Sequence, residues 1–139
     1  MSRRALLLAA LLPGAARADV PDALELAGQP LLALVMHPAV GPRLRVMAQG
    51  HQRALAEAVR GAGPPLAVAE GRWIHGRARA EERRVLLALD TRTEQVALIL
   101  YDGAQPLTFV PPRVAAWPVA LRGAVEAFSP QVAAALRFQ

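Results

Sequence analysis

Two uninterrupted apolar runs, residues 85–89 and 96–100, constrain the fold of this chain most strongly. A short polar segment separates them, and each run has the length of a single strand. A strand that is apolar at every position must be covered on both faces, so the runs predict a central antiparallel hairpin between other layers. Shorter β-type stretches add neighbours and give four or five strands. The predicted strands are residues 66–69, 72–76, 84–90, 95–101 and 106–110.

Helical patterns stand before and after these strands. Apolar residues recur at helical spacing over residues 42–60, which predicts one long helix, and Gly61 and Pro64 end it. After the strands, Pro118 begins one short helix, and Ser129 begins a second as its N-cap. This order predicts an α+β fold, in which an antiparallel sheet has a long helix before it and C-terminal helices packed against it.

The N-terminus has the order of a secretory signal peptide. Arg3 and Arg4 precede an apolar run over residues 5–12, and the small-residue segment 16–18 resembles a cleavage site. No later stretch is long and apolar enough to span a bilayer. We therefore expect a signal peptide over residues 1–18, a single soluble domain over residues 19–139, a periplasmic or secreted location and no stable membrane insertion.

Charge and cysteine content exclude several classes of partner and scaffold. The chain has 16 basic and 11 acidic residues, but the predicted signal peptide contains three of the arginines, which leaves a net charge of +2. Export and this small charge argue against nucleic acid as a partner. The sequence has no cysteine, so the exported domain must be stabilised by packing without disulfides.

The sequence lacks the residue patterns of an enzyme. His37, His51 and His75 have no second ligand at a metal-binding spacing. The only serines are Ser2 and Ser129, and the first belongs to the predicted signal peptide, so no Ser or Cys nucleophile is available. We expect no catalysis, no metal and no cofactor.

The charged segment over residues 75–84 is the candidate binding site. We predict it as a connection between two strands, with His75, Arg77, Arg79, Glu81 and Glu82 as the contacting residues. The alternative interpretation is a solvated, salt-bridged hairpin loop that keeps the protein soluble. The large apolar rings of Trp73 and Trp117 are expected in the core, because the chain has few aromatic residues.

The hairpin formed by residues 84–89 and 95–100 resembles the central hairpin of the inhibitor of vertebrate lysozyme (Ivy-like) family, and the resemblance extends over about residues 31–128. In that family the inhibitory loop is a disulfide-closed Cys-Lys-Pro-His-Asp-Cys segment, whose histidine enters the lysozyme cleft. An ungapped match places His75 and Ala80 at the two cysteines and Ala78 at the histidine. The resemblance therefore implies the fold, but its inhibitory residues do not carry over.

We interpret the chain as a non-catalytic periplasmic binding protein of the kind expected for a diverged lysozyme inhibitor, with a protein such as a lysozyme as its partner. The alternative is an envelope interaction module that binds an acidic peptide or glycan through the Arg-rich segment. The oligomeric state is left open. The altered segment predicts weak or absent inhibition of vertebrate lysozyme.

Overall fold

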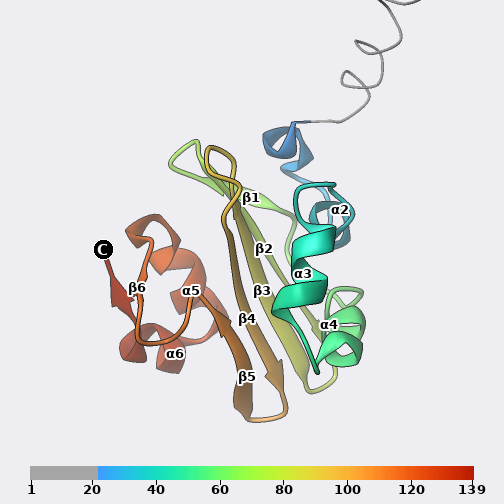
Figure 1. Ribbon diagram of the computed structural model, residues 1–139, viewed down its shortest axis with the longest axis vertical. Coiled ribbons are helices and arrows are strands. Elements are labelled where there is room, and N and C mark those ends of the chain that lie inside the picture. Colours follow the sequence, from blue (N-terminus) through green and yellow to red (C-terminus); the bar gives the residue numbers. More distant parts are fainter. Residues whose placement is uncertain (1–21) are drawn as a thin grey trace, which may run out of the picture.

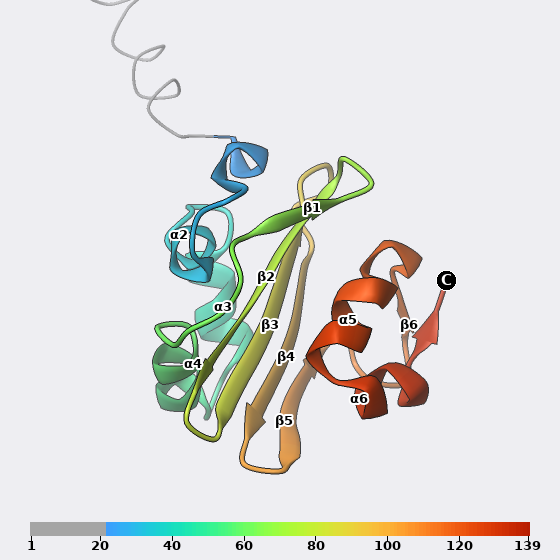
Figure 2. The ribbon, with the colours of Figure 1, turned by 180° about the vertical axis from the view of Figure 1, so that it is seen from behind.

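The computed structural model describes residues 22–139, which form a five-stranded antiparallel sheet with helices on both faces (Figure 1 and Figure 2). Residues before the sheet supply one helical layer, and residues after it supply the other. The predicted α+β fold class is confirmed. The predicted signal peptide lies outside the described residues.

The strands of the sheet follow chain order. They are β1 (Ala67–Ala69), β2 (Trp73–Ala80), β3 (Arg83–Asp90), β4 (Val96–Asp102) and β5 (Gln105–Val110). Strands β3 and β4 pair from Arg83↔Asp102 to Leu89↔Val96. Residues 85–90 and 96–101 are all buried, because side chains on both faces of these strands meet a helical layer. The predicted central hairpin, covered on both faces, is confirmed.

The first helical layer contains η1 (Ala23–Leu26), α2 (Leu31–Val35), α3 (Gly41–Met47) and α4 (Gln52–Ala58). The predicted single helix over residues 42–60 is wrong, because the chain breaks between α3 and α4. Gly50 in this break has a φ of 84°, a backbone conformation that glycine adopts readily after the end of a helix. The break allows Leu44 of α3 and Leu55 of α4 to join the same buried cluster.

The second layer follows the sheet. It contains β6 (Ala116–Trp117), η2 (Val119–Leu121), α5 (Arg122–Phe128), α6 (Pro130–Ala135) and β7 (Arg137–Phe138). Ser129 caps α6 as predicted: its hydroxyl accepts a hydrogen bond from the Val132 amide and shares another, 3.0 Å long, with the Tyr101 hydroxyl. The parallel pairing of β6 with β7 was not expected from the sequence.

The alternating side chains of the sheet divide the core in two. One face of β2 and β3 presents Ile74, Val85 and Leu87 to helices α2–α4. The other face presents Trp73 and Leu86 to α5 and α6, where Trp117 is also buried. The prediction that both tryptophans belong to the core is confirmed, since their exposed fractions are 6% and 1%.

A partly buried ion pair closes the end of the sheet that lies opposite the β2–β3 turn. The carboxylate of Asp90 accepts hydrogen bonds of 2.8 and 2.6 Å from Arg72 and further bonds from the backbone amides of Arg92 and Thr93. The hydrogen bonds from Arg72 hold the pKa of Asp90 well below its ordinary value. Asp90 is therefore a stable anion that anchors the turn after β3.

Candidate functional site

The predicted site residues lie on the β2–β3 hairpin, but most of them do not lie in a loop. Strand β2 continues to Ala80, and Ala80 pairs with Arg83 across a turn made by Glu81 and Glu82. The predicted loop is therefore wrong over residues 77–80. The sequence held a signal for the longer strand, because small residues at 76, 78 and 80 alternate with His75, Arg77 and Arg79.

This alternation brings three predicted residues together and separates the other two. His75, Arg77 and Arg79 share the face of β2 that looks toward α5, whereas Gly76 and Ala78 are buried toward the first helical layer. Glu81 and Glu82 are exposed at the tip of the hairpin. The structure thus places a basic face beside a short acidic turn.

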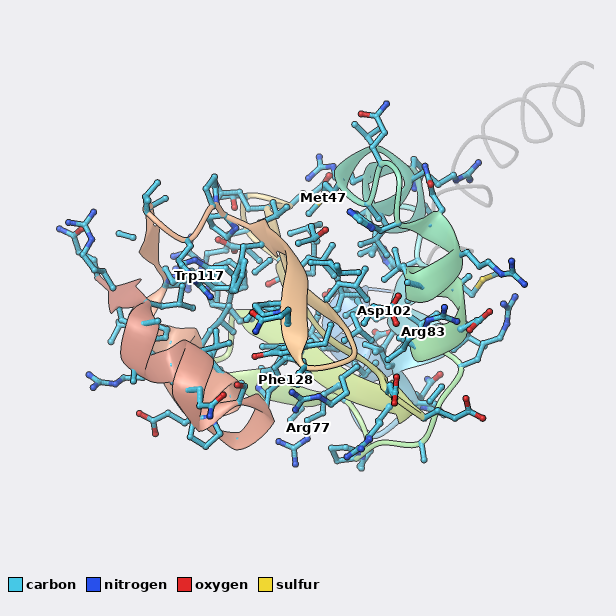
Figure 3. The ribbon with its side chains drawn as sticks, turned by 90° about the horizontal axis from the view of Figure 1, so that it is seen from below. Met47, Arg77, Arg83, Asp102, Trp117 and Phe128 are labelled. Carbon is cyan, nitrogen blue, oxygen red and sulfur yellow. The ribbon has the colours of Figure 1, made fainter. Side chains whose placement is uncertain are left out.

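Arg83 holds the hairpin to the first helical layer and to the next strand. Its guanidinium forms ion pairs with Glu57 of α4 and with Asp102 of β4, the second at 3.3 Å. Figure 3 shows Arg83 and Asp102 next to each other on the side of α4, whereas Arg77 and Phe128 lie nearer the C-terminal helices. The charge of Arg83 is thus already paired within the fold.

Arg84 holds the hairpin to the second layer by different contacts. Its guanidinium lies 4.2 Å from the centre of the Tyr101 ring and 5.2 Å from that of Phe128. One of its Nη atoms donates a 3.1 Å hydrogen bond to the carbonyl of Phe128. These contacts fix the guanidinium plane without neutralising its charge.

Arg77 and Arg79 differ from Arg83, since neither forms an ion pair with a carboxylate in the part of the chain that the structure describes. Nε of Arg79 donates a 2.9 Å hydrogen bond to the backbone carbonyl of Glu81. The partially exposed Arg77 has no such bond to another described residue. The guanidinium groups of Arg77 and Arg79 are therefore available to a partner.

A groove runs along these residues between β2 and α5. It consists of two adjoining hollows of about 290 Å³ and about 200 Å³, which share Pro64, Arg77 and Ala127 as lining residues. Residues 62–67 form one wall, the start of α5 (Gly123 and Ala124) forms part of the other, and β2 and β3 form the floor. We call this feature the β2–α5 groove.

Glycines allow the first wall to lie close against β2. Ala62 exchanges two backbone hydrogen bonds with Arg79, of 3.0 and 2.8 Å. A Cβ atom on Gly61 would lie 2.1 Å from the Arg79 carbonyl oxygen, and one on Gly63 would lie 1.9 Å from that of Arg77. A larger residue at either position would therefore push the wall away from the strand.

His75 lines the larger hollow and is half-buried. Burial lowers its pKa below the ordinary histidine value, and the positive charge of Arg77 lowers it further. The imidazole is therefore neutral at neutral pH, so it can donate one hydrogen bond and accept another. It adds a polar group to the groove without adding charge.

The described residues contain no group of three His, Cys, Asp or Glu side chains that could hold a metal ion. The hydroxyl of Ser129 is buried and already bonded to Tyr101 and to the backbone of α6. Among residues 22–139 no helix is long and apolar enough to cross a membrane. The arrangement around β2 suits binding through charge and shape.

Several lining residues were missed by sequence reasoning. Ala124, Ala127 and Phe128 belong to α5, and Pro64 belongs to a segment expected only to end a helix. The one signal available was the presence of the small residues Gly123, Ala124 and Ala127 in α5, and such residues are also common on ordinary helix surfaces. Their meeting with β2 depends on how the second layer docks.

The geometry defines an α+β domain that presents a rigid basic hairpin face beside a groove. A family model described as inhibitor of vertebrate lysozyme (Ivy) matches residues 39–131, which include the whole sheet and α5. The chain belongs to the Ivy family, a family of lysozyme inhibitors, and the resemblance found in its sequence is confirmed. Comparison with curated proteins and with solved structures gives no significant match.

Proposed function

We propose that this chain is a non-catalytic binding protein that acts outside the cytoplasm as a diverged lysozyme inhibitor and contacts its protein partner, a lysozyme, through the β2–β3 hairpin. The observation that carries the proposal is the family match over residues 39–131, which contains this hairpin. The charged N-terminal order of residues 1–18 supports export to the periplasm or beyond.

The hairpin must bind differently from the disulfide-closed loop of the family. Ala78, at the position of the family's histidine, is 4% exposed and packs into the first core cluster. Ala80 and His75, at the cysteine positions, belong to β2. In place of a disulfide, pairing with β3 holds the segment, so binding has to order only the side chains of Arg77 and Arg79.

We therefore assign the contacts to His75, Arg77 and Arg79 on the strand and to Glu81 and Glu82 at the turn. The guanidinium groups of Arg77 and Arg79 are suited to carboxylates, since each can donate two parallel hydrogen bonds to one carboxylate. A lysozyme cleft offers such carboxylates. Without the family's histidine, we expect inhibition of vertebrate lysozyme to be micromolar at best.

The test is a lysozyme lysis assay with the chain from residue 19 onward as inhibitor. The double change Arg77→Ala with Arg79→Ala is expected to abolish the residual inhibition. The control is Arg45→Ala with Arg92→Ala, which removes the same charge from exposed positions outside the hairpin and is expected to behave like the wild type. Nanomolar inhibition that survives the Arg77 and Arg79 changes would place the contact on another surface.

A further inference from the structure

The lining of the β2–α5 groove contains positive charges and no negative ones. Its polar side chains are those of His75, Arg77, Arg79 and Arg84, and neither hollow is lined by Asp or Glu. The remaining lining is apolar or small, and includes Leu86, Phe128, prolines, alanines and glycines. Such a groove has an unbalanced positive potential that a bound carboxylate would neutralise.

The three guanidinium groups are prepared for such a ligand to different degrees. Arg84 is fixed by two aromatic rings and one backbone carbonyl, so its remaining N–H donors have a set direction. Arg77 lines both hollows and lies at their junction. Arg79 is oriented by its bond to the Glu81 carbonyl. Arg79 and Arg84 pair across β2 and β3 and line the smaller hollow beside Arg77, so a carboxylate held by Arg77 there would have two guanidinium groups near it that lose little freedom on binding.

We propose that the β2–α5 groove receives an extended acidic segment of a protein partner, with a carboxylate side chain held by Arg77. This inference rests on the proposed binding function and names the chemistry of the partner at that site. The floor and walls would contact the peptide backbone and its small side chains, while Arg77, Arg79 and Arg84 select acidic residues.

The lining favours a peptide over an acidic glycan. Sugar hydroxyl groups both donate and accept hydrogen bonds, and among the side chains that line the groove only that of His75 can accept one. No tryptophan or tyrosine lines either hollow as a platform for a sugar ring. Small apolar walls instead match the side of a peptide strand.

The experiment measures fluorescence anisotropy of a fluorescein-labelled Ala-Glu-Ala-Glu-Ala peptide titrated with the chain from residue 19 onward. We expect the Ala-Gln-Ala-Gln-Ala peptide to bind about tenfold more weakly, the size of one lost charge-assisted hydrogen bond. The double change Arg77→Gln with Arg79→Gln should weaken binding of the acidic peptide by at least the same factor. An oligogalacturonate is the competing glycan probe.

A second variant blocks the groove without changing its charge. Ala127 is exposed on α5 and lines both hollows. Ala127→Leu should therefore fill their junction and weaken binding of the acidic peptide about tenfold. Ala134→Leu, at an exposed position of α6 outside the lining, is the matched control and should bind like the wild type. Circular dichroism of each variant verifies that the fold is retained.

Any one of three results would overturn the inference. The Glu and Gln peptides could bind equally, Ala127→Leu could bind the acidic peptide as the wild type does, or the oligogalacturonate could bind more tightly than the acidic peptide. The lysozyme assay separates this failure from that of the proposed function. If lysozyme inhibition depends on Arg77 and Arg79 but the acidic peptide does not bind, only the proposal of a peptide in the groove is refuted. If the acidic peptide binds but the changes at Arg77 and Arg79 do not alter lysozyme inhibition, only the proposal that these arginines contact lysozyme is refuted.

Discussion

Replacing Asp90 by alanine should destabilise the fold strongly, because its carboxylate is buried and fully engaged. The side chain is 1% exposed and accepts two hydrogen bonds from Arg72 and two from backbone amides of the turn after β3. The change removes all four bonds at once. It leaves the guanidinium of Arg72 and the two amides without their acceptor.

The magnitude follows from the exposure of the two partners. Breaking a buried ion pair by removing one member costs about 3–5 kcal/mol. The side chain of Arg72 is 36% exposed and can regain water, so we expect the lower end, a loss of about 3 kcal/mol in the free energy of unfolding. With a urea m-value of about 1.5 kcal/mol/M, the midpoint of unfolding should fall by about 2 M.

The pH dependence gives an independent measure of the same contacts. Because the folded-state pKa of Asp90 is lowered, its contribution is fully present above the ordinary carboxyl pKa of about 3.9 and is lost as the pH falls toward the folded value. Asp90→Asn keeps the shape but does not titrate. The stability difference between wild type and Asp90→Asn should therefore be largest at neutral pH and narrow below about pH 4.

Urea unfolding monitored by the fluorescence of Trp73 and Trp117 measures these quantities, since both rings are buried in the core. The reasoning is refuted if Asp90→Ala lowers the free energy of unfolding by less than about 1 kcal/mol, the cost of one ordinary hydrogen bond. It is also refuted if the difference between wild type and Asp90→Asn is the same at pH 3 as at pH 7.

Two further predictions concern the groove. Gly63→Ala should lower the free energy of unfolding, measured by chemical denaturation, by about 1–3 kcal/mol, because its Cβ would meet the Arg77 carbonyl. Gly123→Ala, whose Cβ would have no atom within 4 Å, should raise the free energy of unfolding by about 0.5–1 kcal/mol. Equal effects of the two changes would contradict the close contact between residues 62–67 and β2. In an NMR titration, His75 should have a pKa below 6.5, and Arg77→Ala should raise it without restoring 6.5, because burial is the larger cause; no change on removing Arg77 would contradict their proximity.

The strands and the two apolar layers could be predicted from the sequence because their signals are local. Runs such as residues 85–89 and 96–100 specify buried strands through side-chain type alone, and Ser129 specifies a helix start through one hydroxyl. The break at Gly50 was missed because the apolar spacing continues across it, so the periodicity outweighed a single glycine.

The hairpin shows where local reasoning fails. High charge over residues 75–84 indicated a loop, but pairing with β3 satisfies the backbone of residues 75–80, and alternation places His75, Arg77 and Arg79 on one face. Tertiary contacts then determine which arginines are engaged within the fold. Arg83 forms ion pairs with Glu57 and Asp102, and Arg84 packs on the rings of Tyr101 and Phe128. These partners are distant in sequence, so no local pattern indicates them.

By itself, the sequence determined the α+β class, the central buried hairpin and the resemblance to the Ivy family, because these depend on the order and polarity of neighbouring residues. Only the tertiary structure decided which charges remain available and where a groove lies. The groove exists because α5 and residues 62–67 dock on either side of one strand face. That arrangement depends on packing between segments separated by some sixty residues, and packing between distant segments is set by the whole core rather than by any local pattern.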